Sequence, residues 1–379
     1  MMDIKKFEGI ETPFYYYDKA LLQETLADIK AELSKHEGYH LHYAIKANAN
    51  IDVLRVIQQA GFGVDAVSGG EIQRALDAGF AAEKIVYAGV GKADWEINLG
   101  LDAGIFCFNV ESLEELGIIN ELAVAKGKTA RVCFRINPNV GAHTHANITT
   151  GLAENKFGIA MDDMETAIKA ALEKKNIEFI GLHFHIGSQI LEMGDFEGLC
   201  RRINELQDRL EAQGITVKNL NVGGGLGIAY DDPDGKPVPD FKKYFDTYAA
   251  GLRLREGQQM HFELGRAVVG QMGSLITKVL YVKHAQVKRF CIVDAGMSDL
   301  IRPALYGAHH EIQNLTSREP EEKYDVVGPI CESSDVFGKD EMLPACRRGD
   351  LIALRSAGAY GEIMACQYNC RKLPKAYLM

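Results

Sequence analysis

Leu41-His42-Tyr43-Ala44-Ile45-Lys46 is a short run of apolar and aromatic residues that ends in a lysine. The run predicts a β-strand, because aromatic and β-branched side chains favour the extended backbone. A helix is expected directly after it, over residues 52–60, and a second strand over residues 62–67. This part of the chain therefore alternates strands and helices in the pattern of parallel β/α units.

The same alternation continues through the first two thirds of the chain. Further strands are expected over residues 84–88, 105–110, 131–136, 179–186, 217–222 and 260–263, which brings the count to eight. The clearest helical patterns between them cover residues 113–125, 164–174 and 196–213. Eight β/α units predict a closed (β/α)8 barrel of the TIM type. An open doubly wound sheet gives a similar alternation and is the second choice.

The pattern changes near residue 268. Short strand-like runs at residues 273–282, 290–294, 324–327 and 351–354 follow one another without helices, which predicts an all-β domain, either a small barrel or a sandwich. The first 18 residues also favour a strand. We therefore expect three parts: an N-terminal segment over residues 1–30 whose strand joins the β domain, a barrel over 31–267, and the C-terminal β domain over 268–379.

Composition and charge exclude several classes of protein. The 379 residues are 47% hydrophobic and 25% charged, the balance of an ordinary globular protein. The formal net charge is −10, whereas nucleic-acid-binding domains are usually basic, so we expect no nucleic-acid partner. No apolar run reaches the roughly 18 residues of a membrane span, and the first residues do not resemble a signal peptide. The eight cysteines form no C-x-x-C motif, which favours reduced thiols in a cytoplasmic protein.

The carboxyl ends of the strands carry the chemistry of a β/α barrel. The residues at these positions are Lys46, Asp65, Arg135, His185, the run Gly223–Gly225, Glu263, Gly265 and Arg266. A lysine in a crowded barrel mouth loses hydration, which lowers its pKa and makes the free amine available for a Schiff base. For a lone lysine, however, we favour the simpler interpretation of a structural lysine paired with an acid.

The glycine run after the seventh strand changes that balance. Barrels commonly bind a phosphate at this position through backbone N–H groups, and glycines allow the backbone to approach the oxygens closely. Together with Lys46 and the acid on the eighth strand, Glu263, the run predicts an aldehyde cofactor that carries a phosphate, pyridoxal 5′-phosphate. Glu263 would keep the pyridine nitrogen of this cofactor protonated and so strengthen the ring as an electron sink.

His183 and His185 are expected on one face of a strand, where they could form a metal pair. No third ligand follows at a suitable spacing, so we expect no metal. We prefer an interpretation in which His185 packs flat against the cofactor ring and His183 lies one layer deeper in the barrel.

Seven motifs, in this order along nearly the whole chain, resemble the diaminopimelate decarboxylase family: Tyr43–Asn48, Gly181–Gln189, Gly223–Gly225, Glu263–Arg266, Arg302–Tyr306, Cys331–Asp335 and Gly358–Tyr360. That family joins an alanine-racemase-like barrel to a β domain. The resemblance implies decarboxylation of meso-2,6-diaminopimelate to L-lysine and CO2, the last step of lysine biosynthesis. One departure is Leu264, where the family usually has proline.

The resemblance also implies a role for each matching residue. Lys46 matches the Schiff-base lysine, His185 the residue stacked on the cofactor ring, and Glu263 the partner of the pyridine nitrogen. The phosphate-binding positions match Gly225, Gly265, Arg266 and Tyr360. The substrate-binding positions match Arg266, Arg302, Tyr306 and Tyr360.

Cys331 and Glu332 match a pair that, in the family, reaches the active site of the other subunit. The resemblance makes Cys331 the proton donor and Glu332 the contact to the distal amino group of the substrate. It therefore implies a homodimer whose active sites are shared between subunits.

Related activities share this scaffold. An alanine racemase sets an arginine against the pyridine nitrogen, so Glu263 argues against that activity. Carboxynorspermidine decarboxylase shares the lysine, the histidine and the glycine run, and it is the main alternative. The distal end of diaminopimelate carries an ammonium, which Glu332 can pair with, and a carboxylate, which suits the fork of an arginine such as Arg302. Arg302 also counts against ornithine-type decarboxylases, and a cofactor-free regulatory homologue would have no need to retain Lys46, Glu263 and Cys331.

Overall fold

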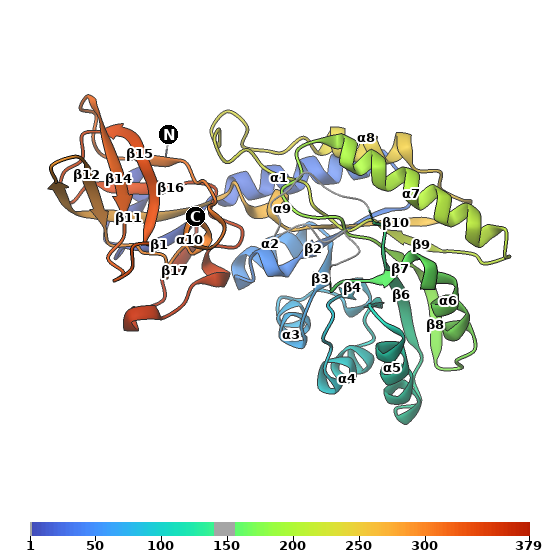
Figure 1. Ribbon diagram of the computed structural model, residues 1–379. Helices are drawn as coiled ribbons and strands as arrows, with labels where there is room; N and C mark the ends of the chain where they lie inside the picture. Colours follow the sequence, from blue (N-terminus) through green and yellow to red (C-terminus); the bar gives the residue numbers. More distant parts are fainter. Residues whose placement is uncertain (1, 140–155) are drawn as a thin grey trace. The chain divides into compact units, whose positions relative to one another are not determined.

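The computed structural model describes residues 2–139 and 156–379 and divides into two compact units (Figure 1). Residues 26–227 and 240–265 form the first, which we call the barrel unit. Residues 1–25, 228–239 and 266–379 form the second, which we call the β unit.

The barrel unit contains a closed ring of parallel strands. Within the described residues, hydrogen bonds join eight strands in the order β2-β3-β4-β5-β6-β8-β9-β10, and β10 pairs again with β2. The short strand β7 pairs with β6 beside the ring. The strands are β2 (Tyr39–Ala44), β3 (Gly63–Ala66), β4 (Ile85–Tyr87), β5 (Cys107–Val110), β6 (Ala130–Asn137), β7 (Ile159–Ala160), β8 (Ile177–His183), β9 (Asn219–Asn221) and β10 (Gln259–Leu264). The predicted (β/α)8 barrel is confirmed, and the open sheet is excluded.

Helices connect the barrel strands, and Figure 1 shows α3 to α6 on the outer side of the strands that they join. The helices are α1 (Lys19–Leu33), α2 (Ile51–Gln59), α3 (Gly69–Asp77), α4 (Asp94–Ala103), α5 (Leu113–Ala125), α6 (Met164–Leu172), α7 (Met193–Glu211) and α8 (Phe241–Gly251). Asn50, Ser68 and Ser112 cap the N-termini of α2, α3 and α5 with their side-chain oxygens. Each cap satisfies a backbone N–H that the helix itself leaves unbonded.

Two site residues were predicted within strands but lie beyond the observed ends of those strands. Strand β2 ends at Ala44, and Lys46 lies in the 3₁₀ turn η2 (Ile45–Ala47). Strand β8 ends at His183, so the prediction that His183 and His185 share one strand face is wrong. The reason is that neither neighbouring strand pairs with β8 beyond His183. Strand β9 ends at Asn221, and β6 pairs with β7 instead once it has passed Arg135.

The β unit is built on a mostly antiparallel sheet with the strand order β13-β16-β11-β12-β14-β15. The N-terminal strand β1 (Phe14–Tyr17) pairs with β11 and with β17, as expected for a strand that joins the β domain. The other strands are β11 (Gly273–His284), β12 (Arg289–Val293), β13 (Ile312–Asn314), β14 (Glu321–Val327), β15 (Val336–Pro344), β16 (Leu351–Leu354) and β17 (Lys375–Leu378). The short helices α9 (Arg266–Val269) and α10 (Arg302–Tyr306) belong to this unit.

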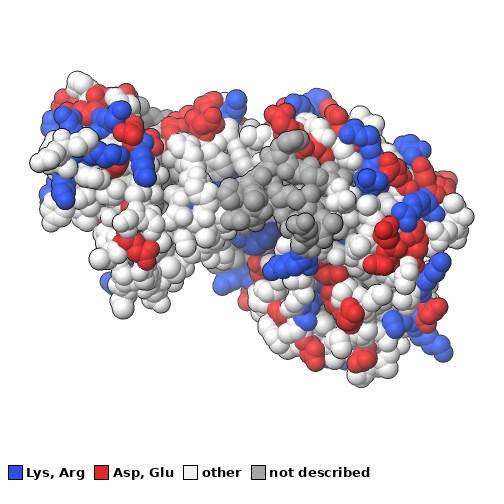
Figure 2. All heavy atoms as spheres, viewed as in Figure 1, with Lys and Arg blue, Asp and Glu red and all other residues white. Residues whose placement is uncertain are grey.

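The surface carries charges of both signs. On the face shown in Figure 2, Lys and Arg side chains alternate with Asp and Glu side chains. None of the helices in the described part of the chain combines the length and the apolar character that a membrane span requires.

Two buried histidines lie at the amino-terminal end of the barrel. His42 and His261 are each 5% exposed, and His42 Nε2 lies 2.9 Å from His261 Nδ1. Burial lowers the pKa of His42 from 6.5 to about 4, and it also lowers the pKa of His261. Both rings are therefore neutral near pH 7.

This burial predicts a loss of stability in acid. Between about pH 6.5 and pH 4 the unfolded chain binds a proton at His42 that the folded chain does not, so the free energy of unfolding falls as the pH falls. For a pKa shift of this size, protonation of His42 alone would lower the free energy of unfolding by about 3 kcal/mol. Urea unfolding of the wild type and of His42→Phe at pH 7 and pH 4.5 checks this. The wild type should lose more stability than the variant, and equal losses would contradict the prediction.

Candidate active site

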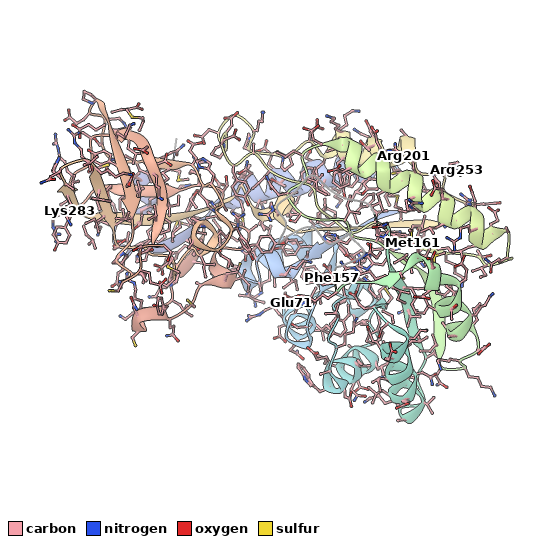
Figure 3. The ribbon with its side chains drawn as sticks, in the orientation of Figure 1. Glu71, Phe157, Met161, Arg201, Arg253 and Lys283 are labelled. Carbon is pink, nitrogen blue, oxygen red and sulfur yellow. The ribbon has the colours of Figure 1, made fainter. Side chains whose placement is uncertain are left out.

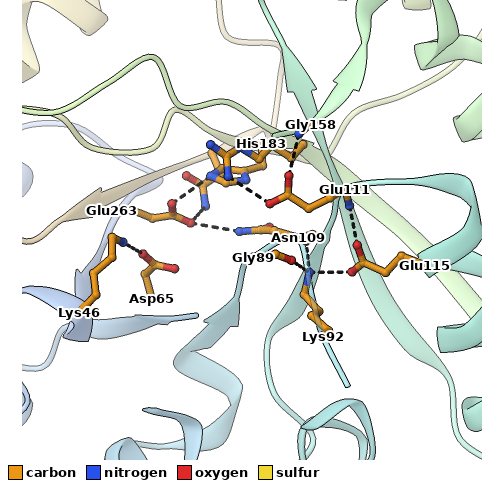
Figure 4. A network of polar contacts seen from close by, with 12 residues as sticks. Lys46, Asp65, Gly89, Lys92, Asn109, Glu111, Glu115, Gly158, His183 and Glu263 are labelled. Atoms are coloured by element: carbon orange, nitrogen blue, oxygen red, sulfur yellow. Dashed lines mark hydrogen bonds and ion pairs between the residues drawn. The ribbon is translucent and has the colours of Figure 1, made fainter. Parts of the chain in front are cut away.

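Lys46 and Asp65 form an ion pair at the mouth of the barrel (Figure 4). Lys46 Nζ donates to Asp65 Oδ2 at 2.8 Å. The side chain of Asp65 is 1% exposed, and its second oxygen, Oδ1, is buried and has no hydrogen-bond partner among the described residues. Burial, supported by the charge of Glu263, raises the pKa of Asp65 to about 6 in spite of Lys46. The pair therefore couples the amine of Lys46 to an acid that titrates close to neutral pH.

A second carboxyl group at the mouth titrates even closer to neutrality. Glu71, in α3 and labelled in Figure 3, accepts a hydrogen bond from the backbone N–H of Val67 at 2.7 Å. Burial raises the pKa of Glu71 to about 7, although Val67 and the charge of Lys46 act against it. Perturbed carboxyl groups beside a lysine are typical of catalytic sites, where pKa values are matched to proton transfer.

Glu263, in β10, is held by side chains from three other strands. Its Oε1 accepts from Asn109 Nδ2 at 3.1 Å and from Asn221 Nδ2 at 2.6 Å, and its Oε2 lies 2.9 Å from His183 Nε2. Burial opposes ionisation, but His183, Lys46 and the bond from Asn221 together hold the pKa of Glu263 well below its usual range. A carboxylate offers about four acceptor directions, so one direction on Oε2 remains for a further donor.

The glycine run packs tightly against the neighbouring backbone. Gly223 and Gly225 have φ angles of +68° and +110°, which side-chain-bearing residues rarely adopt. A Cβ atom on Gly224 would lie 1.9 Å from the carbonyl oxygen of Glu263, so the chain can follow this path only with glycine. The path of the backbone after β9 therefore requires glycine, and Gly225 is the least buried residue of the run.

His185 adjoins the glycine run. The backbone N–H of Gly224 donates to His185 Nδ1 at 3.3 Å, which makes that nitrogen an acceptor. Desolvation and the charges of Arg135 and Lys46 lower the pKa of His185 well below 6.5. The ring is therefore neutral, and it can stack on an aromatic cofactor without placing a cation against it.

A buried network supports the strands that carry the site (Figure 4). Lys92 Nζ contacts Glu115 at 2.6 Å and donates to the backbone oxygens of Gly89 and Asn109 at 2.7 Å. A second ion pair, Arg135 with Glu111 at 3.1 Å, is joined to this one because the N–H of Glu111 donates to Glu115.

The loop Lys156-Phe157-Gly158 attaches to the same network. Gly158 N–H donates to Glu111 at 2.7 Å, and the guanidinium carbon of Arg135 lies 4.5 Å from the centre of the Phe157 ring. Figure 3 labels Phe157 beside the barrel strands. Removing one partner from a buried pair of this kind leaves an uncompensated charge, so we expect these residues to fix the strand ends.

The β unit gathers two buried arginines around Tyr230. Arg266 Nη1 donates to the hydroxyl of Tyr230 at 2.5 Å, and its guanidinium carbon lies 4.9 Å from the centre of the Tyr360 ring. The guanidinium of Arg302 lies over Tyr230 at 4.8 Å, and its Nη1 donates to His310 at 2.8 Å. Burial and the charge of Arg302 lower the pKa of His310 to about 3, so this ring is a neutral acceptor.

Two further observations indicate that this pair of arginines can bind an anion. No ion pair joins Arg302 to a carboxylate among the described residues, although the residue is only 6% exposed. Tyr360 has a φ angle of 57°, a strained value for a residue with a bulky side chain, and such strain gathers at functional sites. Tyr306 ends helix α10 in the same unit and is half-buried.

Cys331 and Glu332 are exposed on the β unit. The backbone N–H of Cys331 donates to Asn369 Oδ1 at 3.2 Å. Glu332 accepts from the hydroxyls of Tyr368, at 2.5 Å, and Ser334, at 3.0 Å, and these bonds lower its pKa. An ionised carboxylate beside a free thiol is thus presented to solvent.

Comparisons with known proteins agree with this geometry. Residues 20–270 match the family model of the pyridoxal-dependent decarboxylases, for the pyridoxal-binding domain. The diaminopimelate decarboxylase of Bacteroides thetaiotaomicron is 68% identical over 374 residues, which cover 99% of this chain and 97% of that protein. The chain belongs to the diaminopimelate decarboxylase family of pyridoxal-dependent decarboxylases.

Solved structures of the diaminopimelate decarboxylase family have the same fold. The enzyme from Helicobacter pylori, complexed with L-lysine, matches with a TM-score of 0.92 at 40% identity over 98% of this chain and 93% of that chain. A lysine/ornithine decarboxylase from Vibrio vulnificus, complexed with putrescine, matches with a TM-score of 0.85 at 21% identity, which shows the shared fold alone.

The residues of the barrel unit fit the cofactor that a pyridoxal-dependent decarboxylase uses. Lys46 offers an amine, and Asp65 beside it keeps one buried oxygen without a hydrogen-bond partner among the described residues. Glu263 is ionised and has an acceptor direction left for a ring nitrogen. The glycine run and the neutral ring of His185 provide the surfaces that a phosphate and a flat ring need.

The structure groups the predicted residues in two places. Lys46, His185, Gly225, Glu263 and Gly265 lie at the carboxyl ends of the barrel strands or directly after them. The remaining predicted residues belong to the β unit, where Arg266 and Arg302 both contact Tyr230 and Arg266 also lies over the ring of Tyr360.

Sequence reasoning missed two asparagines of the site. Asn109 and Asn221 both donate to Glu263, and neither carries a charge or belongs to a recognised motif. His183 was placed one layer deeper, without its contact to this acid. Their positions at the carboxyl ends of strands could have indicated that these residues belong to the site. Asn221 and His183 end β9 and β8, and Asn109 is the last residue but one of β5.

Proposed function

We propose that this chain catalyses the pyridoxal-phosphate-dependent decarboxylation of meso-2,6-diaminopimelate to L-lysine and CO2, the last step of lysine biosynthesis. The observation that carries the reaction type is the buried, ionised Glu263 in the same barrel mouth as Lys46. The substrate is supported by the names of the relatives, which are diaminopimelate decarboxylases at 68% and 43% identity.

In this proposal the barrel unit binds the cofactor. Once bound, the cofactor provides a ring that accepts the electron pair left when the α-carboxylate departs as CO2. Lys46 would hold the cofactor covalently through its amine, and Asp65, whose pKa burial raises to about 6, accepts a hydrogen bond from that amine and orients it. Glu263, held by His183, would keep a proton on the ring nitrogen, and His185, which accepts from Gly224, would pack against the ring.

The phosphate would be bound by Gly225 and Gly265 together with Arg266 and Tyr360. Gly265 packs closely on the turn that carries Lys46, because a Cβ atom there would lie 3.0 Å from the Cβ of Ala47 and 3.2 Å from that of Ala44. A guanidinium presents several N–H donors in a plane, which matches phosphate oxygens better than an ammonium does.

The β unit would bind the substrate and complete the site of a partner subunit. Arg266, Arg302, Tyr306 and Tyr360 hold the substrate, with the fork of Arg302 on its distal carboxylate. Glu332 pairs with the distal ammonium, and the thiol of Cys331 returns a proton to the α-carbon after CO2 has left. We propose that Cys331 and Glu332 act in the active site of the other subunit of a homodimer, in the cytoplasm, where thiols stay reduced.

The substrate assignment is tested with purified protein and added pyridoxal phosphate. CO2 release and product identity are measured for meso-diaminopimelate and for carboxynorspermidine side by side. We expect L-lysine and CO2 from diaminopimelate, with a kcat/KM at least tenfold above that for carboxynorspermidine. A preference for carboxynorspermidine would reject the substrate but keep the reaction type, and turnover of neither would reject both.

A further inference from the structure

One amide group joins the glycine run to the acid of the site. Asn221 Nδ2 donates to Glu263 Oε1 at 2.6 Å, and Asn221 Oδ1 accepts from the backbone N–H of Gly223 at 2.9 Å. The side chain is buried, and the residue is 3% exposed. The carboxylate of Glu263 can only accept and the N–H of Gly223 can only donate. The amide nitrogen of Asn221 must therefore face Glu263, and its oxygen must face Gly223.

The same segments are also joined through their backbones. Glu263 N–H donates to the carbonyl oxygen of Gly223 at 2.8 Å, and the position of Gly224 leaves no room for a side chain beside Glu263. The bond from the N–H of Gly223 to Asn221 Oδ1 closes an Asx turn, and Gly223 in this turn has a φ angle of +68°. Asn221 therefore holds the first residue of the run as well as the carboxylate.

Asn109 provides a natural comparison. Its Nδ2 donates to the same oxygen, Glu263 Oε1, at 3.1 Å. Its own backbone oxygen is held by Lys92, and its side-chain oxygen lies near the thiol of Cys107 at 3.7 Å. Asn109 thus orients the acid from β5, and among the described residues no hydrogen bond joins its side chain to the glycine run.

We propose that Asn221 is a positioning residue that couples the two ends of the cofactor site. Its amide nitrogen orients Glu263 for the ring nitrogen, and its amide oxygen holds the Gly223 turn open for the phosphate. This assignment rests on the proposed function. It predicts that loss of the Asn221 amide weakens phosphate recognition and the action of Glu263 together, whereas loss of the Asn109 amide weakens only the latter.

The test compares binding of pyridoxal phosphate with binding of pyridoxal, which lacks the phosphate. Full-length protein is freed of cofactor, and both dissociation constants are measured by equilibrium dialysis for the wild type, Asn221→Ala, Asn221→Asp and Asn109→Ala. The dissociation constant for pyridoxal divided by that for pyridoxal phosphate measures what the phosphate contributes to binding. A change at the ring nitrogen affects both constants equally and leaves this ratio unchanged. Circular dichroism verifies that each variant is folded.

We expect Asn221→Ala to lower this ratio about tenfold, the effect of one well-placed hydrogen bond. Asn221→Asp keeps the acceptor for Gly223 and should keep the ratio within about twofold of the wild type, as should Asn109→Ala. The turnover number should fall in all three variants, because each loses a donor to Glu263.

Two results would overturn the coupling. One is that Asn221→Ala has the same ratio of dissociation constants as the wild type. The other is that Asn109→Ala lowers the ratio as much as Asn221→Ala does, which would indicate general loosening of the site. If Asn221→Ala does not fold, Asn221→Asp still decides, because a lowered ratio in that variant contradicts the role of the acceptor. A wild-type protein that binds both compounds equally well would instead reject the phosphate site of the proposed function.

Discussion

Replacement of Lys46 by alanine is expected to lower CO2 release from diaminopimelate by roughly 10³-fold or more, a loss of the kind seen when an enzyme loses its covalent nucleophile. Lys46 is the lysine whose amine lies beside the buried Asp65, close to Glu263 in the barrel mouth. The loss is measured as the turnover number at saturating substrate and cofactor, with no added amine.

Lys84→Ala is the matched control for this substitution. Lys84 belongs to the same barrel unit but precedes β4 at the amino-terminal end of the ring, where its amine donates to the backbone oxygen of Gly61. It should keep near-normal turnover. Near-normal turnover in Lys46→Ala would show that the cofactor is bound elsewhere.

Cys331→Ala is also expected to be nearly inactive, yet mixing it with Lys46→Ala should restore activity. If Cys331 acts in the other subunit's site, a hybrid dimer contains one site with both residues intact and one site with neither. With equal mixing and free exchange, about half of the dimers are hybrids, so recovery should approach about a quarter of the wild-type activity. The measurement is CO2 release before and after subunit exchange.

Cys366→Ala serves as the matched control, because Cys366 is an exposed cysteine of the same β unit outside the predicted site. It should be active on its own. Hybrids of Lys46→Ala and Cys331→Ala that form, as shown with two affinity tags, but recover no activity would place Cys331 in its own subunit's site or outside catalysis.

The barrel could be predicted because its signal is local. Buried strands of three to eight residues alternate with amphipathic helices, and helix α5 (Leu113–Ala125) was predicted with its observed bounds. The ends of the strands were harder to predict, because they depend on the neighbouring strand. Lys46 moved into a 3₁₀ turn and His185 left its strand where the adjoining strands stop.

The residues that the sequence did not reveal depend on contacts between distant segments. Asn109 and Asn221 gain their roles only when β5, β9 and β10 meet in a closed ring. The segment 228–239 belongs to the β unit, where Asp234 pairs with Arg355 at 2.9 Å, a contact between residues more than 100 positions apart in the sequence. The polar strand β15 (Val336–Pro344) was missed because it lacks the apolar pattern that marks a strand.

The most direct test of the central claim, that Lys46 holds pyridoxal phosphate in the barrel, is to map the site of attachment. Borohydride reduces the bond between the cofactor aldehyde and a lysine amine to a stable secondary amine, and digestion with mass spectrometry then locates the modified residue. The account predicts loss of the visible absorption band and a single phosphopyridoxyl group on the peptide that contains Lys46. Stoichiometric labelling of another lysine, such as Lys92 or Lys156, with Lys46 unmodified would contradict it.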